Sequence, residues 1–593
     1  MNAVSPVEAL VTDHLDLWTA ALKRKSAAGR GSSSKIELYG IRKLRELILE
    51  LAVRGLLVPQ DPNDEPASEL LKKIAAEKAQ QMKEGRIKKG KPLPSISGGS
   101  QHLPSGWSWT CMAALGEIAP RNEVKDDVIA SFVPMPLIST RFDGRHDHES
   151  TTWAEIKKGY THFADGDVAI AKITPCFENS KAAIFSGLHN GIGAGTTELH
   201  VVRPMGEFVS RSYLLLYLKS PPFLRVGETK MTGSAGQKRV PTEFFSFNPL
   251  PLPPLAEQHR IVAKVDELMA LCDQLEQQTE ASLGAHQTLV ETLLSTLTSA
   301  ADHAQFASAW QRIAGHFDTL FTTEESIAQL KQTILQLAVM GKLVPQDPND
   351  EPASGLLKRL FAARDSWLMV CKEQNPECTT MLRKLKMLGV PKAPFPLPET
   401  WGCAHLIQVS LLLVDCHNKT APYSAQGIPI IRTSNVRERR FRMEDVKFVS
   451  LDTYNYWSRR CPPAPGDIIF TREAPMGEAA IIPQEAQYCL GQRTMLIRPM
   501  HDHISAEYLL LALTEPHLLE RASEYAIGST VKHLRVGDVE NLNIPIPPLA
   551  EQHRIVAKVD ELMALCDQLK SRLSDAQTTQ LHLADALVEQ AIG

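Results

Sequence analysis

The sequence is poor in cysteine, poor in aromatic residues and free of long apolar runs. Ten cysteines are spread over 593 residues without one Cys-x-x-Cys, which argues against a disulfide framework and against a zinc ribbon. No stretch approaches the roughly 18 to 20 consecutive apolar residues of a membrane helix. Asp13 and His14 stand where a signal peptide would be apolar. We therefore expect a cytoplasmic protein.

The chain also lacks a net charge of one sign. Lysine and arginine number 64 against 68 aspartates and glutamates, which excludes a uniformly basic coat for nucleic acid. Any anionic partner must then be bound by local basic patches. The length and the 43% hydrophobic content predict several folded domains.

The chain contains a long internal repeat. Residues 253–275 read PPLAEQHRIVAKVDELMALCDQL, and residues 547–569 repeat these 23 residues without a change. Upstream, LVPQDPNDEPAS at residues 57–68 recurs at residues 343–354. Chance does not produce such matches, so the chain is a duplication.

Two globular stretches of equal length lie between the repeated blocks. Each begins at a Leu-Pro-x-x-Trp sequence, and 146 residues separate Trp107 from Pro253 and Trp401 from Pro547. Within them only scattered anchors match, such as Gly-Asp at 166–167 and 466–467 and Arg-Pro at 203–204 and 498–499. Short apolar runs after the Gly-Asp pairs predict strands. The framework is thus duplicated, whereas the surface residues differ.

The repeated blocks have the periodicity of long amphipathic helices. Each follows a Pro-Pro pair and carries a glutamate in its first turn, as a helix start does. Apolar residues recur at alternating spacings of four and three, which predicts coiled-coil spacer helices of about 25 to 30 residues. The residues of this stripe are Ile261, Val265, Leu268, Cys272 and Leu275, with Ile555, Val559, Leu562, Cys566 and Leu569 in the second copy.

These patterns predict a mixed α+β fold. We expect two α/β domains separated by long antiparallel coiled-coil helices, in a circular, pseudo-two-fold organisation that brings the two chain ends together. The expected parts are a helical region with a basic linker at 1–102, a first globular domain at 103–253, a central helical region at 254–396, a second globular domain at 397–547 and a helical region at 548–593.

The candidate catalytic and metal-binding motifs of this sequence are incomplete. The phosphate-loop-like run from Gly85 to Lys91 has Pro92 in place of the Ser or Thr that would ligate magnesium. The His-Asp-His triplets at 146–148 and 501–503 have no further ligand at metal spacing. We expect no catalytic residue and no metal site in this chain.

Local basic clusters lie within the two globular stretches. Arginine can bind guanine edges bidentately, asparagine and glutamine can read adenine, and serine can reach phosphates. A solvated charged face explains any single residue equally well, so only the set carries weight. The candidates for DNA binding are Lys172, Lys181, Lys230, Gln237, Lys238 and Arg239 in the first stretch, and Arg432, Ser434, Asn435, Arg437, Arg439, Arg440, Lys532, His533 and Arg535 in the second.

The order and spacing of these motifs resemble the specificity (S) subunit of type I restriction-modification enzymes. The resemblance rests on the PLPPLAEQ and PIPPLAEQ helix starts at 251–258 and 545–552, the two Leu-Pro-x-x-Trp openings and the duplication, and it covers almost the whole chain. It implies two target-recognition domains on conserved helical regions and a subunit that catalyses nothing. It also implies partners, namely double-stranded DNA, two methyltransferase subunits that use S-adenosylmethionine and two restriction subunits that use ATP and Mg²⁺.

The repeated helices would then be docking surfaces for those partners, and the two domains would read an asymmetric, bipartite DNA target. Two alternatives remain open at this point. The chain could be a coiled-coil scaffold for proteins without DNA specificity, or a nuclease or methyltransferase in its own right.

Overall fold

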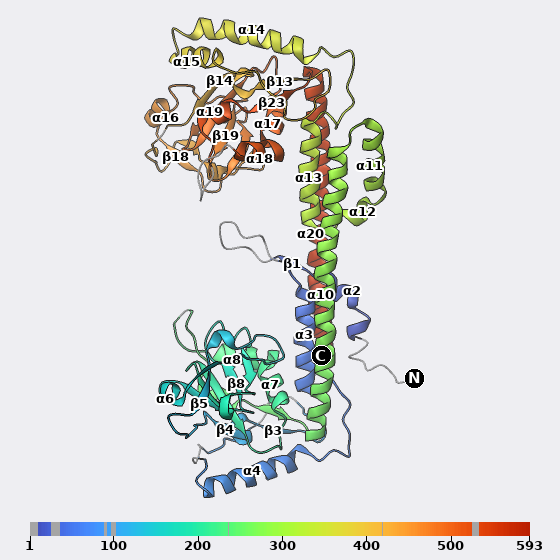
Figure 1. Ribbon diagram of the computed structural model, residues 1–593, viewed down its shortest axis with the longest axis vertical. Coiled ribbons are helices and arrows are strands. Elements are labelled where there is room, and N and C mark those ends of the chain that lie inside the picture. The colour runs from blue at the N-terminus through green and yellow to red at the C-terminus, as the bar shows by residue number, and fades with distance from the viewer. Residues whose placement is uncertain are drawn as a thin grey trace. The chain divides into compact units, whose positions relative to one another are not determined.

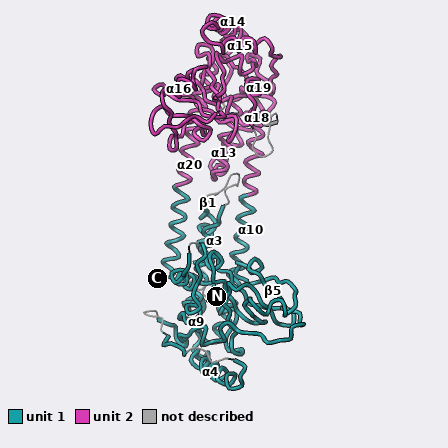
Figure 2. The backbone as a smooth tube through the Cα atoms, turned by 90° about the vertical axis from the view of Figure 1, so that its left-hand side faces the viewer, with its two compact units in different colours: residues 1–283, 575–593 teal, residues 284–574 magenta. Residues whose placement is uncertain are grey.

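The computed structural model describes residues 10–24, 36–87, 92–96, 102–234, 236–417, 419–524 and 533–592. The chain forms two compact units (Figure 2). Unit 1 contains residues 1–283 together with 575–593, and unit 2 contains residues 284–574. Unit 1 is therefore built from both ends of the sequence, as the predicted circular organisation requires.

Two long helices belong to both units. Helix α10 (Leu255–Ser299) starts in unit 1 and ends in unit 2, whereas α20 (Leu549–Ile592) starts in unit 2 and ends in unit 1 (Figure 1). They contain 45 and 44 residues, so the expectation of 25 to 30 residues was too short. The helices continue past the identical blocks because neither proline nor a run of turn residues interrupts them.

Unit 1 contains a helical bundle and the first globular domain. We call this domain and its counterpart in unit 2 the recognition-type domains. Its helices are α2 (Leu15–Ala20), α3 (Tyr39–Arg54), α4 (Ala67–Lys83), α5 (Met112–Leu115), α6 (Trp153–Ile156), α7 (Arg211–Lys219), α8 (Pro221–Lys230), α9 (Thr242–Phe247) and the short 3-10 helices η1 (Met135–Leu137) and η2 (His189–Gly191). Its strands are β1 (Lys23–Arg24), β2 (Ile36–Glu37), β3 (Ser108–Thr110), β4 (Gly116–Ile118), β5 (Ile129–Val133), β6 (Glu149–Thr152), β7 (Thr161–Ala164), β8 (Val168–Ala171), β9 (Ala182–Ile184), β10 (Ile192–Gly195), β11 (Leu199–Pro204) and β12 (Leu250–Leu252).

Unit 2 repeats this plan. Its helices are α11 (His303–Gly315), α12 (Phe317–Leu320), α13 (Glu324–Val339), α14 (Ala353–Cys371), α15 (Pro376–Leu385), α16 (Leu451–Trp457), α17 (Ala506–Thr514), α18 (Pro516–Glu524), α19 (Val536–Glu540), η3 (Leu406–Gln408) and η4 (Thr433–Asn435). Its strands are β13 (Gly402–His405), β14 (Ser410–Asp415), β15 (Ile428–Ile431), β16 (Val436–Arg437), β17 (Arg440–Phe441), β18 (Lys447–Val449), β19 (Ile468–Arg472), β20 (Met476–Ile481), β21 (Cys489–Leu490), β22 (Thr494–Pro499) and β23 (Asn543–Ile546).

The antiparallel sheets of the two units correspond strand by strand, whereas the second sheet has an additional strand, β7, in unit 1. The order β4-β11-β8-β9 in unit 1 matches β14-β22-β19-β20 in unit 2, and both sheets are antiparallel. A second sheet mixes directions, because β5 pairs antiparallel with β6 and parallel with β10, as β15 pairs with β18 and β21. The mixed α+β prediction is therefore confirmed.

The repeated LVPQDPNDEPAS segment ties each domain to the start of its long helix. In unit 1, Gln60 Nε2 donates to the carbonyl oxygen of Gly55, which ends α3 at φ +72°. Trp107 Nε1 donates to Glu257 at 3.0 Å, and Arg260 pairs with Asp64 at 2.7 Å. In unit 2 the corresponding contacts are Gln346 to Gly341 at 3.0 Å and Arg554 to Asp350 at 2.6 Å.

The helical bundles are also pseudo-equivalent. In unit 1, Arg45 of α3 contacts Asp273 of α10, and in unit 2, Lys331 of α13 contacts Asp567 of α20. The offsets 331−45 = 286 and 567−273 = 294 are those of the two sequence repeats. The two repeats differ in offset by eight residues, yet α3 pairs with α10 through the same two positions by which α13 pairs with α20.

Candidate nucleic-acid interface

A buried ion pair forms the centre of each recognition-type domain. Asp167 belongs to the Gly-Asp turn before β8 and receives two hydrogen bonds from Arg203 of β11, at 2.9 and 2.8 Å. Asp467 and Arg498 repeat the pair at 2.8 and 2.7 Å. Burial raises the pKa of Asp167, and the hydrogen bonds from Arg203 oppose this. The pair explains why Gly-Asp and Arg-Pro are retained in both domains, because loss of either partner would leave a buried charge.

The second domain has a basic cleft beside β15. This cleft has a volume of about 200 Å³ and contains two predicted residues, Arg432 and Ser434. The prediction from the sequence did not include Lys419 and Arg493, which line the same cleft. The remaining lining residues are Thr420, Ala421, Tyr423, Ile430, Thr433, Trp457, Gly491 and Gln492. Cationic, amide and aromatic side chains together are what contacts to phosphates and bases require.

The position of the missed Arg493 in the sequence could have revealed it. Gly491 to Arg493 lie directly before the strand that aligns with β11, through the shared Arg-Pro anchor. In the first domain the same connection carries Thr197, and this residue lines the cleft of that domain. Comparing the two copies around each anchor would therefore have identified this connection, although the two copies differ in sequence.

Other predicted residues of the second domain have structural contacts of their own. Asn435 is 2% exposed and its side chain bonds to Arg432 and to the carbonyl of Arg442. Arg437 donates to the carbonyl oxygens of Thr433 and Val436. These two residues shape the loop around the cleft.

Arg440 and Arg535 are exposed, whereas His533 is half-buried and its backbone bridges to that of Glu473. Arg439 is half-buried, and Asp560 and Asp567 of α20 act on it electrostatically. Lys532 lies outside the described residues.

The first domain has a larger cleft with a different lining. It has a volume of about 320 Å³ and contains the predicted Lys172. Its other residues are Ile118, Ala119, Pro120, Arg121, Gly159, Tyr160, Thr161, His162, Thr197, Leu199, His200, Val201 and Thr242. Burial lowers the pKa of His200 to about 4, so this imidazole is neutral at neutral pH. The cationic residues of this cleft are therefore Arg121 and Lys172.

A loop beside this cleft gathers most of the remaining candidates. The segment 232–239 pairs with the end of β8 through a bridge between Ile173 and Arg239. Arg239 forms an ion pair with Glu198 at 2.8 Å, and Gln237 and Lys238 are exposed. Lys230 is exposed at the end of α8, whereas Lys181 donates to the carbonyl oxygen of Met135 at 2.9 Å.

The stripe predicted for the long helices lies in the core of each unit. Ile261, Val265 and Cys272 are fully buried, Leu268 and Leu275 are at most 9% exposed, and Ile555, Val559 and Cys566 are buried equally well. Leu562 and Leu569 are partly buried against the same core. These side chains thus pack within their own unit. A docking surface on these helices must use the exposed residues between them, because the stripe itself is already covered.

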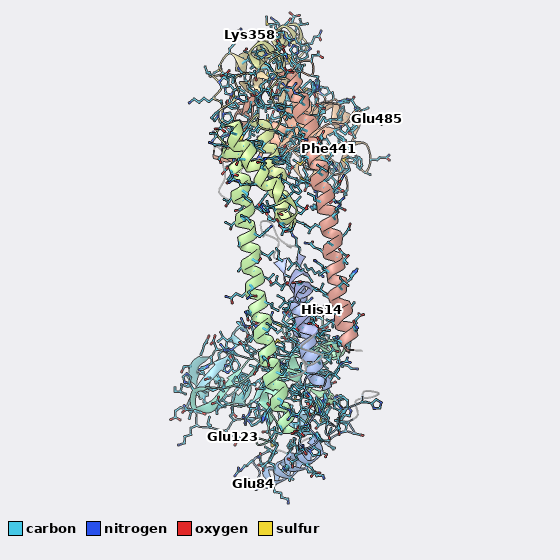
Figure 3. All side chains as sticks on the ribbon, turned by 90° about the vertical axis from the view of Figure 1, so that its right-hand side faces the viewer. His14, Glu84, Glu123, Lys358, Phe441 and Glu485 are labelled. Atoms are coloured by element: carbon cyan, nitrogen blue, oxygen red, sulfur yellow. The ribbon has the colours of Figure 1, made fainter. Side chains whose placement is uncertain are left out.

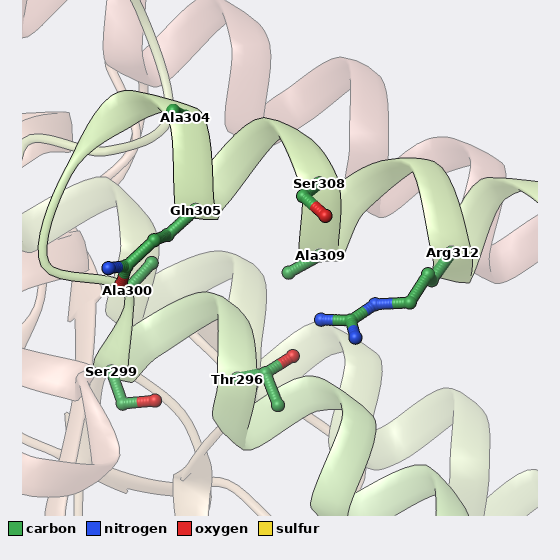
Figure 4. Close-up of a pocket in the computed structure, with 8 residues that line it drawn as sticks. All are labelled: Thr296, Ser299, Ala300, Ala304, Gln305, Ser308, Ala309 and Arg312. Carbon is green, nitrogen blue, oxygen red and sulfur yellow. The ribbon is translucent and has the colours of Figure 1, made fainter.

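A third cleft, of about 490 Å³, lies in unit 2 between the end of α10 and α11 (Figure 4). It is lined mainly by small and polar side chains and contains none of the candidate DNA-binding residues. Within the described ranges, histidine, cysteine and carboxylate side chains form no group of three that could hold a metal ion. In the same ranges, no helix combines the length and the apolar character needed to cross a bilayer.

Comparison with known proteins identifies the family. The model of the type I restriction modification DNA specificity domain matches residues 149–285 and 415–576, and these two stretches cover most of each recognition-type domain and the starts of both long helices. The specificity subunit of the type I restriction enzyme EcoAI from Escherichia coli is 50% identical over 99% of this chain and 100% of its own length. The chain belongs to the family of type I restriction enzyme specificity subunits.

A second relative gives the same result. The EcoEI specificity subunit of Escherichia coli is 48% identical over 99% of this chain and 100% of its own length. A solved HsdS subunit from Thermoanaerobacter tengcongensis is 19% identical, with a TM-score of 0.41, and the match covers 83% of this chain and 98% of that one. The chain is therefore the DNA specificity subunit of a type I restriction-modification system, and its part is specificity, not catalysis. This confirms the resemblance and excludes both alternative functions.

Proposed function

We propose that this specificity subunit reads an asymmetric, bipartite target in double-stranded DNA, with one half-site bound by each recognition domain. It would assemble with two methyltransferase subunits and two restriction subunits. We assign S-adenosylmethionine, ATP and Mg²⁺ to those partners. The observation that carries the proposal is the pair of equivalent domain frames with unlike clefts, because unlike clefts bind unlike base sequences.

The cleft linings support an asymmetric target. The Asp167–Arg203 and Asp467–Arg498 pairs fix the same framework twice. Around this framework the first cleft presents one arginine and one lysine, Arg121 and Lys172, whereas the second presents two arginines and one lysine, Arg432, Arg493 and Lys419. Because arginine can bind a guanine edge bidentately, clefts that differ in the number and position of their arginines favour different bases.

Energetics favour two half-sites over one. A mismatched base pair costs about 1 to 3 kcal/mol, so a half-site of three or four pairs discriminates by about 4 to 10 kcal/mol. Competition from about 10⁶ or more other sites requires on the order of 8 kcal/mol. One domain is marginal for this task, whereas two domains together are sufficient.

The identical helix blocks support two copies of one partner. Their buried residues are explained by packing within each unit, whereas an exposed residue has no such constraint on its identity. Exposed residues on one face of α10 have identical twins on α20. They are Ala256, His259, Ala263, Glu267, Ala270 and Gln274, with Ala550, His553, Ala557, Glu561, Ala564 and Gln568. Two identical faces in one chain suit two identical methyltransferase subunits.

Mapping of methylated adenines in cells tests this function. Cells that express this chain with its methyltransferase subunit should carry modified adenines in two unlike half-sites at a fixed gap, and cells without this chain should lack them. A continuous or palindromic motif would contradict the bipartite asymmetric target.

A further inference from the structure

A short hairpin occupies the same place in each recognition domain. In unit 1 it spans residues 138–146, between β5 and β6, and a bridge between Ile138 and His146 closes it. In unit 2 it spans residues 436–441, between β15 and β18, and contains β16 and β17 (Figure 3, where Phe441 is labelled). The two hairpins read ISTRFDGRH and VRERRF, so their sequences differ. They share a position in the topology and an arginine near the turn.

The hairpin of unit 1 contacts the long helix α10 through Arg141. Arg141 Nη2 lies 2.9 Å from Asp273 Oδ2. Arg45 of α3 lies 2.5 Å from the other oxygen of the same carboxylate, and it also pairs with Glu276 at 2.6 Å. Asp273 thereby joins three elements, namely the hairpin, α3 and α10. A cleft of about 990 Å³ separates hairpin and helix around this contact.

The same hairpin is fixed to its own domain. Lys219 at the end of α7 is 4% exposed, and its ammonium group donates to the carbonyl oxygens of Arg141 and Ser180, each at 2.8 Å. Gly144 at the turn has φ +63°, and a Cβ there would come within 2.4 Å of Leu215. The recognition domain therefore presents Arg141 to α10 from a well-defined backbone.

The hairpin of unit 2 carries Arg439 at its turn. Glu438 and Arg439 form its two-residue turn, with φ of 51° and 64°. Burial lowers the pKa of Arg439, Asp560 and Asp567 oppose that effect, and Arg440 adds to it. Asp567 also pairs with Lys331 of α13. Asp567 thus pairs with a cation of the neighbouring helix α13, as Asp273 pairs with Arg45 of α3.

We propose that Asp273 and Asp567, identical acceptors on the two long helices, orient the recognition domains through the positioning residues Arg141 and Arg439. The two hairpins differ in sequence, yet each supplies an arginine to an aspartate at the same position of its long helix. Domains of different sequence can thereby be held at the same angle to that helix. The consequence for DNA, a fixed gap between half-sites, rests on the proposed function.

The contact in unit 1 is weak enough to open. The side chains of Arg141 and Asp273 are 68% and 48% exposed, and Asp143 of the hairpin offers a second carboxylate 3.9 Å from Arg141. Exposed ion pairs contribute little and are screened by salt. The Arg141–Asp273 contact should therefore open and close in the intact subunit.

Hydrogen–deuterium exchange on the full-length chain tests the contact itself. Arg141→Ala and Asp273→Ala should each speed exchange of amides in 138–146 by about two- to fivefold. The double variant should exchange no faster than either single one, because both remove the same contact. Arg145→Ala is the matched control, since Arg145 is a neighbouring exposed arginine that pairs only within the hairpin, with Asp143. Asp567→Ala should leave 138–146 unchanged and speed exchange in 436–441.

Methylation mapping with the partner subunits tests the positioning role. Arg141→Ala should broaden the gap between half-sites while the half-site sequences stay the same, which loss of stability alone would not do. Additive exchange effects, or a gap distribution unchanged from wild type, would overturn the inference. Wild-type sites that are not bipartite would instead overturn the proposed function, and the exchange experiment would still decide whether the contact exists.

Discussion

The hydroxyl of Tyr39 donates a 2.7 Å hydrogen bond to Oδ1 of Asp585, although 546 residues separate them in the sequence. Lys43 lies 3.2 Å from the same carboxylate. In unit 2 the positions that correspond to Lys43 and Asp585 are Gln329 and Glu291, which are 2.9 Å apart. The contact between α3 and the end of the chain is thus the counterpart of a contact in the middle of the chain.

Loss of the Tyr39 hydroxyl should destabilise unit 1 and leave unit 2 unchanged. Tyr39→Phe removes one hydrogen bond to a carboxylate, at an expected cost of about 1 to 2 kcal/mol. Hydrogen exchange in α3 should therefore accelerate, whereas exchange in α13 should not. Glu291→Ala is the reciprocal control, because it removes the equivalent acceptor in unit 2. Equal acceleration in both units by either variant would contradict this assignment.

Charge introduced into the buried stripe should unfold unit 1 rather than simply release a partner. Val265→Asp places a carboxylate at a fully buried position, at an expected cost of about 3 kcal/mol or more. Ala263→Glu, on the exposed face of the same helix turn, should change stability by about 0.5 kcal/mol or less and weaken methyltransferase binding. Denaturant unfolding and co-purification distinguish the two effects. Full partner binding by Ala263→Glu together with its twin Ala557→Glu would exclude this face as the docking surface.

Variants in the two clefts should affect different half-sites. Arg432→Ala should cost about 1 to 3 kcal/mol of discrimination in one half-site, and Lys172→Ala should weaken binding at the other. Sequencing of methylated sites reports each half-site separately. Relaxation of the same half-site by both variants would show that the clefts do not act independently.

Lengthening both long helices should lengthen the gap. Seven residues inserted after Leu283 in α10 and after Ser574 in α20 add about 10 Å and return nearly to the original helical phase. The preferred gap should grow by about three base pairs, with unchanged half-sites. An insertion in one helix alone is the control, since the other helix, which also joins the units, opposes it. An unchanged gap in the double insertion would show that the helices do not set the spacing.

Burial of Glu257 and Glu551 should make stability depend on pH. Burial raises the pKa of each carboxyl above its ordinary value. The folded state therefore retains a proton that the unfolded state has lost, so stability should fall as pH rises from the ordinary pKa, near 4.3, through the raised one. Glu257→Gln keeps an oxygen that can accept from Trp107 and removes the titration. Its stability should decline less over this interval, as denaturant midpoints at several pH values would show.

The duplication made the fold predictable and left the interface largely unpredictable. The spacing of Ile261, Val265 and Leu268 predicts a buried helical stripe, because burial selects apolar residues at a fixed period. The same sequence cannot show which unit covers the stripe, and for this reason docking was assigned to residues that the structure places in the core. Arg437 and Asn435 look like DNA contacts in the sequence, yet their partners are backbone atoms and side chains of the same loop. Residues that bind ligand and residues that shape a loop have the same composition, so only geometry separates them.

The composition of unit 1 from residues 1–283 and 575–593 has a consequence for its biosynthesis. Unit 2 is continuous in sequence, so all of its residues have been translated before the partners of Tyr39 and Lys43 are made. Helix α3 therefore lacks part of its cover until this last segment has been synthesised. A nascent chain stalled before residue 575 would leave exposed to chaperones the part of α3 that the end of the chain covers.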